Sequence, residues 1–419
     1  MVDPMQLYKE RLERLEAVMK GKEPDRVPIY AATAVWHGTY AGYTTREVLF
    51  DYNKCKEAAL KVARDFDFDS WAVIAGLEGM ILCTAFMEKQ PEIGISSRFL
   101  VGKFHEVLRD VFTRWPGIEL AENAHPQFIG KELMKVEEYE QLAENPLDFI
   151  HRVILPRMCE GLRDIGSPEY NATLAKFGME VERYNAFFNS LIAGLIGLGY
   201  PAIPMSWSYA PLDFIGDFLR DVKNVVLDLY RYPDKVKAAV EALTPVFVKT
   251  AAISGAIPPE VKKQLGTDIV QCFFPLHLNE YLNPKLYNEF YWPYLKKVFN
   301  EVIKMGQTPF VLFEGRHDAH LETLRELPKK KVIGVFEKTD PRKVREVAGD
   351  HVILVSGPPN ALLIGGTPQK VEEFMKKLLE DVKEGGFMVW PGVDGGLSRD
   401  VKPENLKAMV EAVKKYGRY

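Results

Sequence analysis

Three short apolar runs alternate with helical segments in residues 309–355, which read PFVLFEGRHDAHLETLRELPKKKVIGVFEKTDPRKVREVAGDHVILV. The runs occupy 309–313, 332–336 and 352–355 and are rich in β-branched residues, which is typical of strands. Asp340 precedes Pro341, so a capping side chain stands before a proline at the first helical position. Strands that are apolar on both faces are typical of parallel strands covered by helices. The stretch therefore predicts a repeated strand–helix unit.

The same pattern continues outward in both directions along the chain. Five further apolar runs lie at 27–35, 71–77, 201–207, 269–275 and 387–390. Eight strands that alternate with helices predict an α/β fold of the closed (β/α)8, or TIM-barrel, type. A doubly wound open sheet is the alternative. It is disfavoured because no glycine-rich dinucleotide turn follows an early strand, and for the same reason we expect no nucleotide cofactor.

One long segment interrupts the alternation. Residues 80–198 carry mostly helical patterns and are too numerous for a single crossover between strands two and three. We expect a helical insertion that covers the mouth of the barrel, and we treat residues 1–419 as a single domain. Residues 5–20 predict an amphipathic helix before the first strand.

Composition narrows the class of protein. The chain is 47% hydrophobic and 27% charged, which is globular, and its formal charge of -4 offers no basic surface for nucleic acid or anionic lipid. The first residues are charged, and no run of about 18 apolar residues occurs, so we expect a cytoplasmic protein without a membrane segment. The four cysteines lack C-x-x-C spacing, which predicts buried thiols instead of disulfides or thiolate zinc ligands.

Candidate catalytic residues follow from the barrel prediction, because reacting groups of such barrels lie at the carboxyl ends of the strands. Glu314 ends the run 309–313 and is followed by Gly315, His277 ends CFFPLH, and Glu78 follows the second run. A carboxylate and an imidazole at strand ends are placed to move a proton or bind a cation. The alternative for Glu314 is a helix cap or an ion pair with Arg316, and for His277 and Glu78 a structural role.

Aromatic residues after strands one and three suggest the wall of a substrate pocket. Trp36 and His37 follow the first strand, and Trp207 and Tyr209 lie at the third. They suit a flat organic substrate, although the same residue types also pack ordinary cores. His317 and His320 have the three-residue spacing that is typical of a solvated helix face.

The chain resembles the uroporphyrinogen decarboxylase superfamily, including its corrinoid-dependent methyltransferase branch, over nearly its full length. Four segments carry the resemblance: GKEPDRVPIY (21–30), FIGDFLRDVKNVVLDLYRYPDKVKAAVEAL (214–243), ILVSGPPNALLIGGTPQKVEEF (353–374) and GGFMVWPGVDGGLSRDVKPENLKAM (385–409). The resemblance implies the barrel fold independently of the strand pattern. It also implies a homodimer.

Several family positions differ from the decarboxylase pattern. Decarboxylases have arginines that bind propionates near the amino terminus, whereas the matching stretch here is AVWHGTYAG (34–42). Their aspartate after strand two falls near Gly76, two residues before Glu78, and their late histidine falls in PGVDGG (391–396), which has none. The resemblance therefore favours the methyltransferase branch.

The zinc-binding methyltransferases of the superfamily differ from this chain as well. Their H-x-C-G run aligns with Leu312-Phe313-Glu314-Gly315, and their late cysteine aligns with Val393. Zinc, or another divalent ion, would need oxygen and nitrogen ligands here. The candidates are Glu314, His277 and Asp394.

The leading hypothesis is an enzyme that moves a methyl group from a small organic compound, such as a methoxylated one, to a corrinoid carried by a separate protein. The second is a cofactor-free decarboxylase that acts on another carboxylated ring. The third is a non-catalytic barrel that binds a corrinoid or tetrapyrrole.

Overall fold

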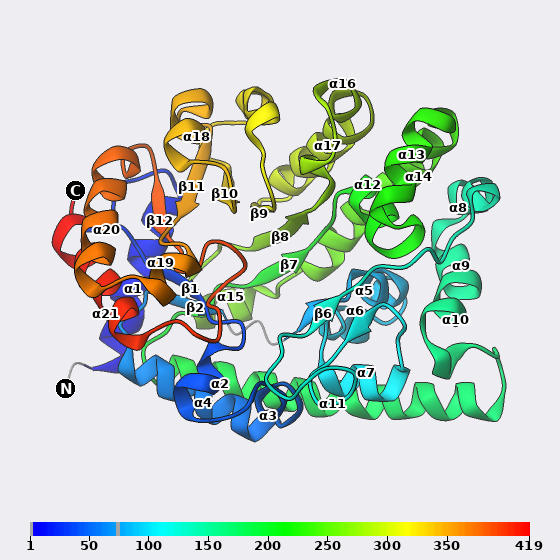
Figure 1. Ribbon diagram of the computed structural model, residues 1–419, viewed down its shortest axis with the longest axis horizontal. Coiled ribbons are helices and arrows are strands. Elements are labelled where there is room, and N and C mark those ends of the chain that lie inside the picture. The colour runs from blue at the N-terminus through cyan, green and yellow to red at the C-terminus, as the bar shows by residue number, and fades with distance from the viewer. Residues whose placement is uncertain (1–2, 73–75) are drawn as a thin grey trace.

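A computed structural model describes residues 3–72 and 76–419 and contains eight parallel strands in a ring (Figure 1). Six form one sheet in the order β12-β11-β10-β9-β8-β7, β1 pairs with β2, and Ile29 bridges to Val389 to join β1 with β12. No ladder between β2 and β7 is present in the described residues. The arrangement confirms the (β/α)8 barrel.

Each of the eight predicted runs overlaps a strand. The strands are β1 (Tyr30–Ala32), β2 (Ser70–Ala72), β7 (Met205–Trp207), β8 (Gln271–Leu276), β9 (Thr308–Phe313), β10 (Val332–Phe336), β11 (Val352–Ser356) and β12 (Phe387–Val389). Residues 73–75 of the second predicted run lie outside the described residues. The ends of the strands therefore differ from the apolar runs by a few residues.

Helices follow the strands on the outside of the ring. They include α4 (Tyr52–Asp65), α14 (Pro233–Ser254), α17 (Trp292–Lys304), α18 (Pro341–Ala348), α20 (Pro368–Val382) and α21 (Pro403–Tyr416). The predicted cap is present, because the side chain of Asp340 accepts from the N–H of Arg342, and Thr367 caps α20 in the same way by accepting from the N–H of Lys370. The predicted first helix is α1 (Pro4–Met19).

Helix α1 closes the amino-terminal end of the barrel. Its Leu15, Val18 and Met19 are buried in one apolar cluster with the inward residues of the strands. Gln271, the first residue of β8, also contacts the sulfur of Met19. The opposite end of the barrel, where the carboxyl ends of the strands meet, is left for the site.

The predicted insertion lies between β2 and β7 and is mostly helical (Figure 1). Its helices include α5 (Met80–Met87), α6 (Pro91–Ser96), α7 (Gly102–Leu108), α8 (Tyr139–Glu144) and the long α11 (Pro168–Ile196). It also contains two antiparallel pairs that the pattern did not predict, β3 (Leu77–Glu78) with β4 (Phe99–Leu100) and β5 (Thr113–Arg114) with β6 (Gln127–Phe128). Glu78 therefore belongs to the β3–β4 pair, and not to the tip of a barrel strand as predicted.

The four cysteines are free and buried, as predicted. In the described ranges, no single helix is long and apolar enough to span a membrane; α14 and α15 (Pro259–Leu265) pass such a test only when taken together as a bent pair.

Candidate active site

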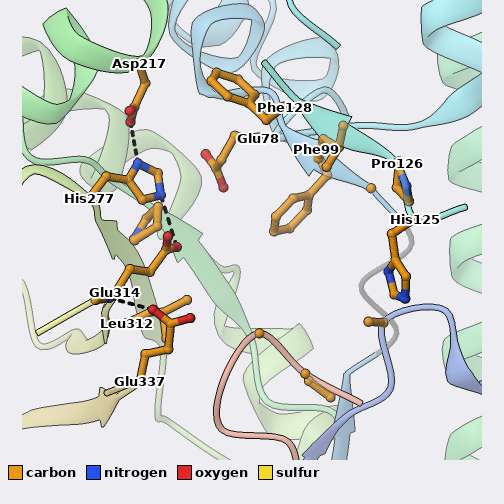
Figure 2. Close-up of a pocket in the computed structure, with 18 of the residues that line it drawn as sticks. Glu78, Phe99, His125, Pro126, Phe128, Asp217, His277, Leu312, Glu314 and Glu337 are labelled. Atoms are coloured by element: carbon orange, nitrogen blue, oxygen red, sulfur yellow. Dashed lines mark hydrogen bonds and ion pairs between the residues drawn. The ribbon is translucent and has the colours of Figure 1, made fainter. Parts of the chain in front are cut away.

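A cavity of about 730 Å³ opens at the carboxyl ends of the barrel strands (Figure 2). The barrel contributes residues from β1, β8, β9, the turn after β10 and the loop after β12. The insertion contributes residues that include Glu78, Phe99, His125 and Phe128, and the segment after β7 contributes residues that include Asp217. Glu314, His277 and Glu78, the predicted catalytic residues, all line this one cavity.

His277 lies between two carboxylates. Its Nδ1 is 2.5 Å from Oδ2 of Asp217, and its Nε2 is 3.0 Å from Oε1 of Glu314. Burial disfavours a charged imidazole, but Asp217 and Glu314 outweigh burial and raise the pKa of His277 well above its usual range. His277 is therefore a cation at neutral pH that donates from both ring nitrogens.

Asp217 is held in place by the segment that follows β7. It lies in the π-helical turn Ile215–Arg220 that continues α12 (Pro211–Phe214) after β7. Such turns recur at functional sites because they redirect side chains. The hydroxyl of Tyr209 donates to Oδ2 of Asp217 at 2.8 Å, which fixes the carboxylate that faces His277.

Asp213 fixes the backbone beneath His277. Its two oxygens accept from the backbone N–H groups of His277 at 3.3 Å and Leu278 at 2.8 Å, and the hydroxyl of Tyr291 donates to it at 2.6 Å. Burial, and then the charge of Asp217, raises the pKa of Asp213 to about 7. This carboxyl positions the end of β8 and does not line the cavity.

Glu314 is presented by the end of β9. Its N–H donates to the carbonyl of Leu276 at 3.1 Å, and Asn279 donates to its carbonyl at 2.9 Å. Gly315 then turns the chain with φ +63°, and its N–H donates to Oε2 of Glu337 at 2.5 Å. The Glu314 side chain, 37% exposed, reaches His277 on one side and the cavity on the other.

Glu78 forms an ion pair with Arg98. Nη1 of Arg98 donates to both oxygens of Glu78, at 3.0 and 2.8 Å. Burial raises the pKa of Glu78, although Arg98 and His277 oppose that effect. The guanidinium lies over the rings of Phe99 and Trp207, at 4.7 and 5.5 Å from their centroids. Nη1 of Arg98 is thus engaged by Glu78, whereas its Nε and Nη2 have no hydrogen-bond partner among the described residues.

Trp36 and His37 lie elsewhere, which corrects their prediction as substrate-binding residues. Trp36 is buried, and its indole N–H donates to the carbonyl of Val401 at 2.8 Å. His37 is fully buried, with its ring nitrogens near Thr33 and Cys55, and burial lowers its pKa to about 4. Both belong to the packing between α2 (Trp36–Ala41) and α4.

Trp207 and Tyr209 lie behind the cavity wall, so they are also corrected as direct substrate contacts. The Trp207 ring packs edge-on against Phe99 at 5.7 Å, and Phe99 itself lines the cavity. Tyr209 is fully buried and positions Asp217. Trp207 therefore supports the wall through Phe99, and Tyr209 supports the site through Asp217.

His317 and His320 are buried, in contrast to the expected solvated face. His320 stacks on Tyr287 at 3.8 Å between centroids, and its Nε2 lies 3.0 Å from the carbonyls of Asn279 and Leu282. Burial lowers the pKa of His317 to about 3. The helical turn after β9 packs inward, so both imidazoles belong to the core.

Comparison with known proteins identifies the family. The model of the family described as uroporphyrinogen decarboxylase (URO-D) matches residues 206–416, which is half of the chain. The chain belongs to the uroporphyrinogen decarboxylase family. The match begins in β7 and includes every barrel strand that follows it.

Curated relatives of this uroporphyrinogen decarboxylase family member match over part of their length. Uroporphyrinogen decarboxylase of Danio rerio is 30% identical over 45% of this chain and 49% of its own, and that of Homo sapiens is 28% identical over 33% and 38%. The chain thus spans about half or less of the length of these relatives.

A solved structure agrees with the fold over nearly the whole chain. A methyltransferase from Methanosarcina mazei superposes with a TM-score of 0.58 at 16% identity, covering 96% of this chain and 98% of that one. At this identity the match supports the fold, that is, the barrel and its insertion. It does not indicate the activity of this chain.

The predicted metal set does not assemble in this family member. Leu312, Glu314 and Val393, which align with zinc ligands of related methyltransferases, do line one cavity, but only Glu314 carries a donor. Oδ1 of Asp394 accepts from the N–H and the amide of Asn360, both at 2.9 Å. Within residues 3–72 and 76–419, no group of three His, Cys, Asp or Glu is suited to hold a metal. The described residues therefore do not fit a three-ligand zinc site.

Sequence reasoning missed several groups of the cavity. Asp217 follows β7 by ten residues, inside a helical pattern that looked like ordinary scaffold, and its place in a quoted family segment was the available signal. His125 and Phe128 come from the insertion, whose strand pairs were not predicted. Glu337, in contrast, follows the sixth strand, and the rule that selects Glu314 at a strand end selects it as well. Figure 2 shows these groups around the cavity.

Proposed function

We propose that this protein transfers a methyl group from a small organic substrate to a corrinoid carried by a separate protein. The observation that carries the proposal is the chain Asp217–His277–Glu314, which stores a proton and ends on a carboxylate at the cavity. Loss of a methyl group leaves an electron pair on the oxygen or nitrogen that held it. A proton delivered to that atom prevents the reverse reaction.

The corrinoid, when bound, supplies a Co(I) nucleophile that takes the methyl carbon while the electron pair of the broken bond stays on the heteroatom. Glu314 is the group of the relay that meets the substrate. It takes the proton from Nε2 of His277, 3.0 Å away, and passes it to the heteroatom. Asp217 keeps the imidazole oriented and charged. Such positioned proton transfer contributes roughly 100- to 10,000-fold in rate.

Charge disfavours the rival decarboxylase reaction on a carboxylated ring. The cations nearest the reacting region already have carboxylate partners, Arg98 with Glu78 and His277 with Asp217 and Glu314. A substrate with several carboxylates would meet the negative partners of these cations, and Arg98 is buried and does not belong to the cavity lining. Methyl transfer from a neutral or cationic compound does not require cations in the cavity.

Free cob(I)alamin as acceptor tests the proposal. We expect the protein to methylate it from at least one member of a panel of methyl ethers and methylated amines, with loss of the cob(I)alamin absorption band as the readout. Glu314→Gln should lower kcat about 100-fold or more. Glu326→Gln, a carboxylate paired with Lys296 away from the cavity, is the matched control and should stay within about twofold.

Two results would contradict the proposal. Release of labelled carbon dioxide from a carboxylated ring without corrinoid would favour the decarboxylase. Tight retention of a corrinoid or tetrapyrrole by both wild type and Glu314→Gln, with turnover by neither, would favour the non-catalytic barrel.

A further inference from the structure

We propose that the cavity binds an organic cation, and that the methyl donor is a methylated ammonium compound. This inference names the substrate class of the proposed methyl transfer, and it rests on that proposed function. Its test is a binding measurement that does not depend on turnover. Two sides of the cavity carry the argument, one aromatic and one acidic.

The aromatic side is a continuous row of rings. Phe99, Phe273, Phe310 and Trp390 all line the cavity, with centroids 6.4, 6.3 and 5.8 Å apart from one to the next. Phe273 and Phe310 are register partners on β8 and β9, so the barrel itself sets their spacing. Ring faces carry negative potential, and rings of this kind bind quaternary ammonium groups.

The acidic side lines the same cavity. In Figure 2 the ring of Phe99, at one end of the aromatic row, lies across the cavity from Glu314 and Glu337. Oε2 of Glu337 accepts only the N–H of Gly315 among the described hydrogen bonds of that carboxylate, and no ion pair of Glu337 is formed in the described residues. Glu337 thus adds a negative charge that its surroundings do not neutralise.

The positive groups of the cavity are few and engaged. His277 is held by two carboxylates, and Lys338 is half-exposed, 3.9 Å from Glu280. Burial lowers the pKa of His125, so that this imidazole is neutral at pH 7. The carboxylates therefore outnumber the cations at the lining; they are Glu78, Asp217, Asp221, Glu280, Glu314 and Glu337.

The combination selects a positive ligand. An ammonium group between the aromatic row and the carboxylates gains both cation–π and Coulomb attraction in a partly desolvated space, whereas an anion meets repulsion from both sides. After methyl loss the amine is neutral, and the Glu314–His277 relay returns it to a cation. Substrate and product then suit the same site.

A pair of isosteric probes tests the inference directly. Choline and 3,3-dimethyl-1-butanol have the same shape and differ in one positive charge at the branched centre. We expect isothermal titration to show choline binding about tenfold tighter than its neutral isostere. The preference should shrink at high salt, and 4-methoxybenzoate, an anion with a methoxy group, should bind more weakly than choline.

Two conservative variants assign the preference to the two sides. Glu337→Gln keeps an acceptor for the N–H of Gly315 but removes a charge, and Phe273→Leu removes a ring face but keeps an apolar side chain. Each should reduce choline binding several-fold. Binding of 3,3-dimethyl-1-butanol should change less than twofold in Glu337→Gln, which also shows that the variant is folded.

Equal binding of the two isosteres, binding of neither at millimolar concentration, or tighter binding of the anion would overturn the inference. The proposed function fails separately. Selective choline binding without methyl transfer from any donor would retain the cation site and remove the methyltransferase, and transfer from a neutral methyl ether without choline binding would do the reverse.

Discussion

His277 keeps its proton in a buried site because each ring nitrogen contacts a carboxylate. The side chain of Glu314 lies partly in the cavity and contacts only Nε2. Without a second carboxylate, the proton on the buried Nδ1 would have no negative partner. The second carboxylate, Asp217, is itself fixed by Tyr209. The charge and orientation of the imidazole therefore depend on Asp217 and Tyr209, and Asp217 acts through His277 as a positioning residue in this scheme.

Asp217→Asn provides the pH test of this arrangement. The folded pKa of His277 is raised, so activity that needs its proton is present at lower pH and falls as pH rises through that pKa. Removing the Asp217 charge lowers the pKa of His277. The falling alkaline limb of kcat should move to lower pH by about one pH unit or more.

Asp394→Asn is the control for the pH profile. Asp394 contacts Asn360 and not His277, so its profile should match that of wild type. The same variant tests the zinc prediction, because elemental analysis would show loss of metal on substitution if Asp394 were a ligand. An unchanged limb in Asp217→Asn would contradict the role given to His277.

At the scale of elements, the tip of β9 determines where Glu314 lies. Gly315 has φ +63°, and a Cβ at this position would overlap the Glu280 side chain, with the two Cβ atoms 2.9 Å apart. The turn therefore requires glycine for conformation and for space. Glu280 lines the same cavity, so crowding at this turn would be felt at the site.

Gly315→Ala should lower both stability and methyl transfer. Gly42, with φ +90° and no atom within 4 Å of the place that a Cβ would take, is the matched control for strain alone. Gly42→Ala should cost about 1–2 kcal/mol of unfolding free energy with kcat unchanged. Gly315→Ala should cost about 1–3 kcal/mol more, with a clear fall in kcat. Denaturant unfolding and kinetics check both, and equal effects would argue against a crowded turn.

The insertion supplies part of the cavity through its small strand pairs. Asp110 accepts from the N–H of Thr113 at 2.9 Å and contacts His105 at 2.5 Å, which anchors β5. The partner strand β6 carries Phe128 to the cavity. These two-residue strands are too short for an alternating pattern to reveal, which is why the helical prediction for 80–198 omitted them.

At the scale of the whole molecule, we predict that residues 1–419 unfold as one domain. Elements of the insertion pack on those of the barrel, as α11 does on α4 and α5 on α14. Calorimetry should give a single transition, with tryptophan fluorescence and circular dichroism changing together. Two resolved transitions would show that the insertion is a separate domain. The homodimer and the cytoplasmic location also stay predictions, and sedimentation tests the first.

The strand positions and the barrel class could be predicted from sequence because apolar runs, helix caps and their alternation are local properties of the chain. Glu314 and His277 could be predicted because each ends a buried run, and parallel strands in a barrel bring such ends to one rim. Trp36 and His37 followed a strand as well, but the chain turns there at once into α2, and that helix packs them into the core.

The amino-acid sequence by itself determined the eight-strand barrel, the place of the insertion and the two strand-tip residues at the centre of the site. The apolar runs, the helix caps and the turn residues that indicate them are each contained in a short stretch of the chain. Only the tertiary structure decided that Asp217 meets His277, that Asp394 does not, and that four aromatic rings line the same cavity as the carboxylates. Those contacts join residues that are far apart in the chain. Strand register and the packing of the insertion set their distances, and neither leaves a local pattern.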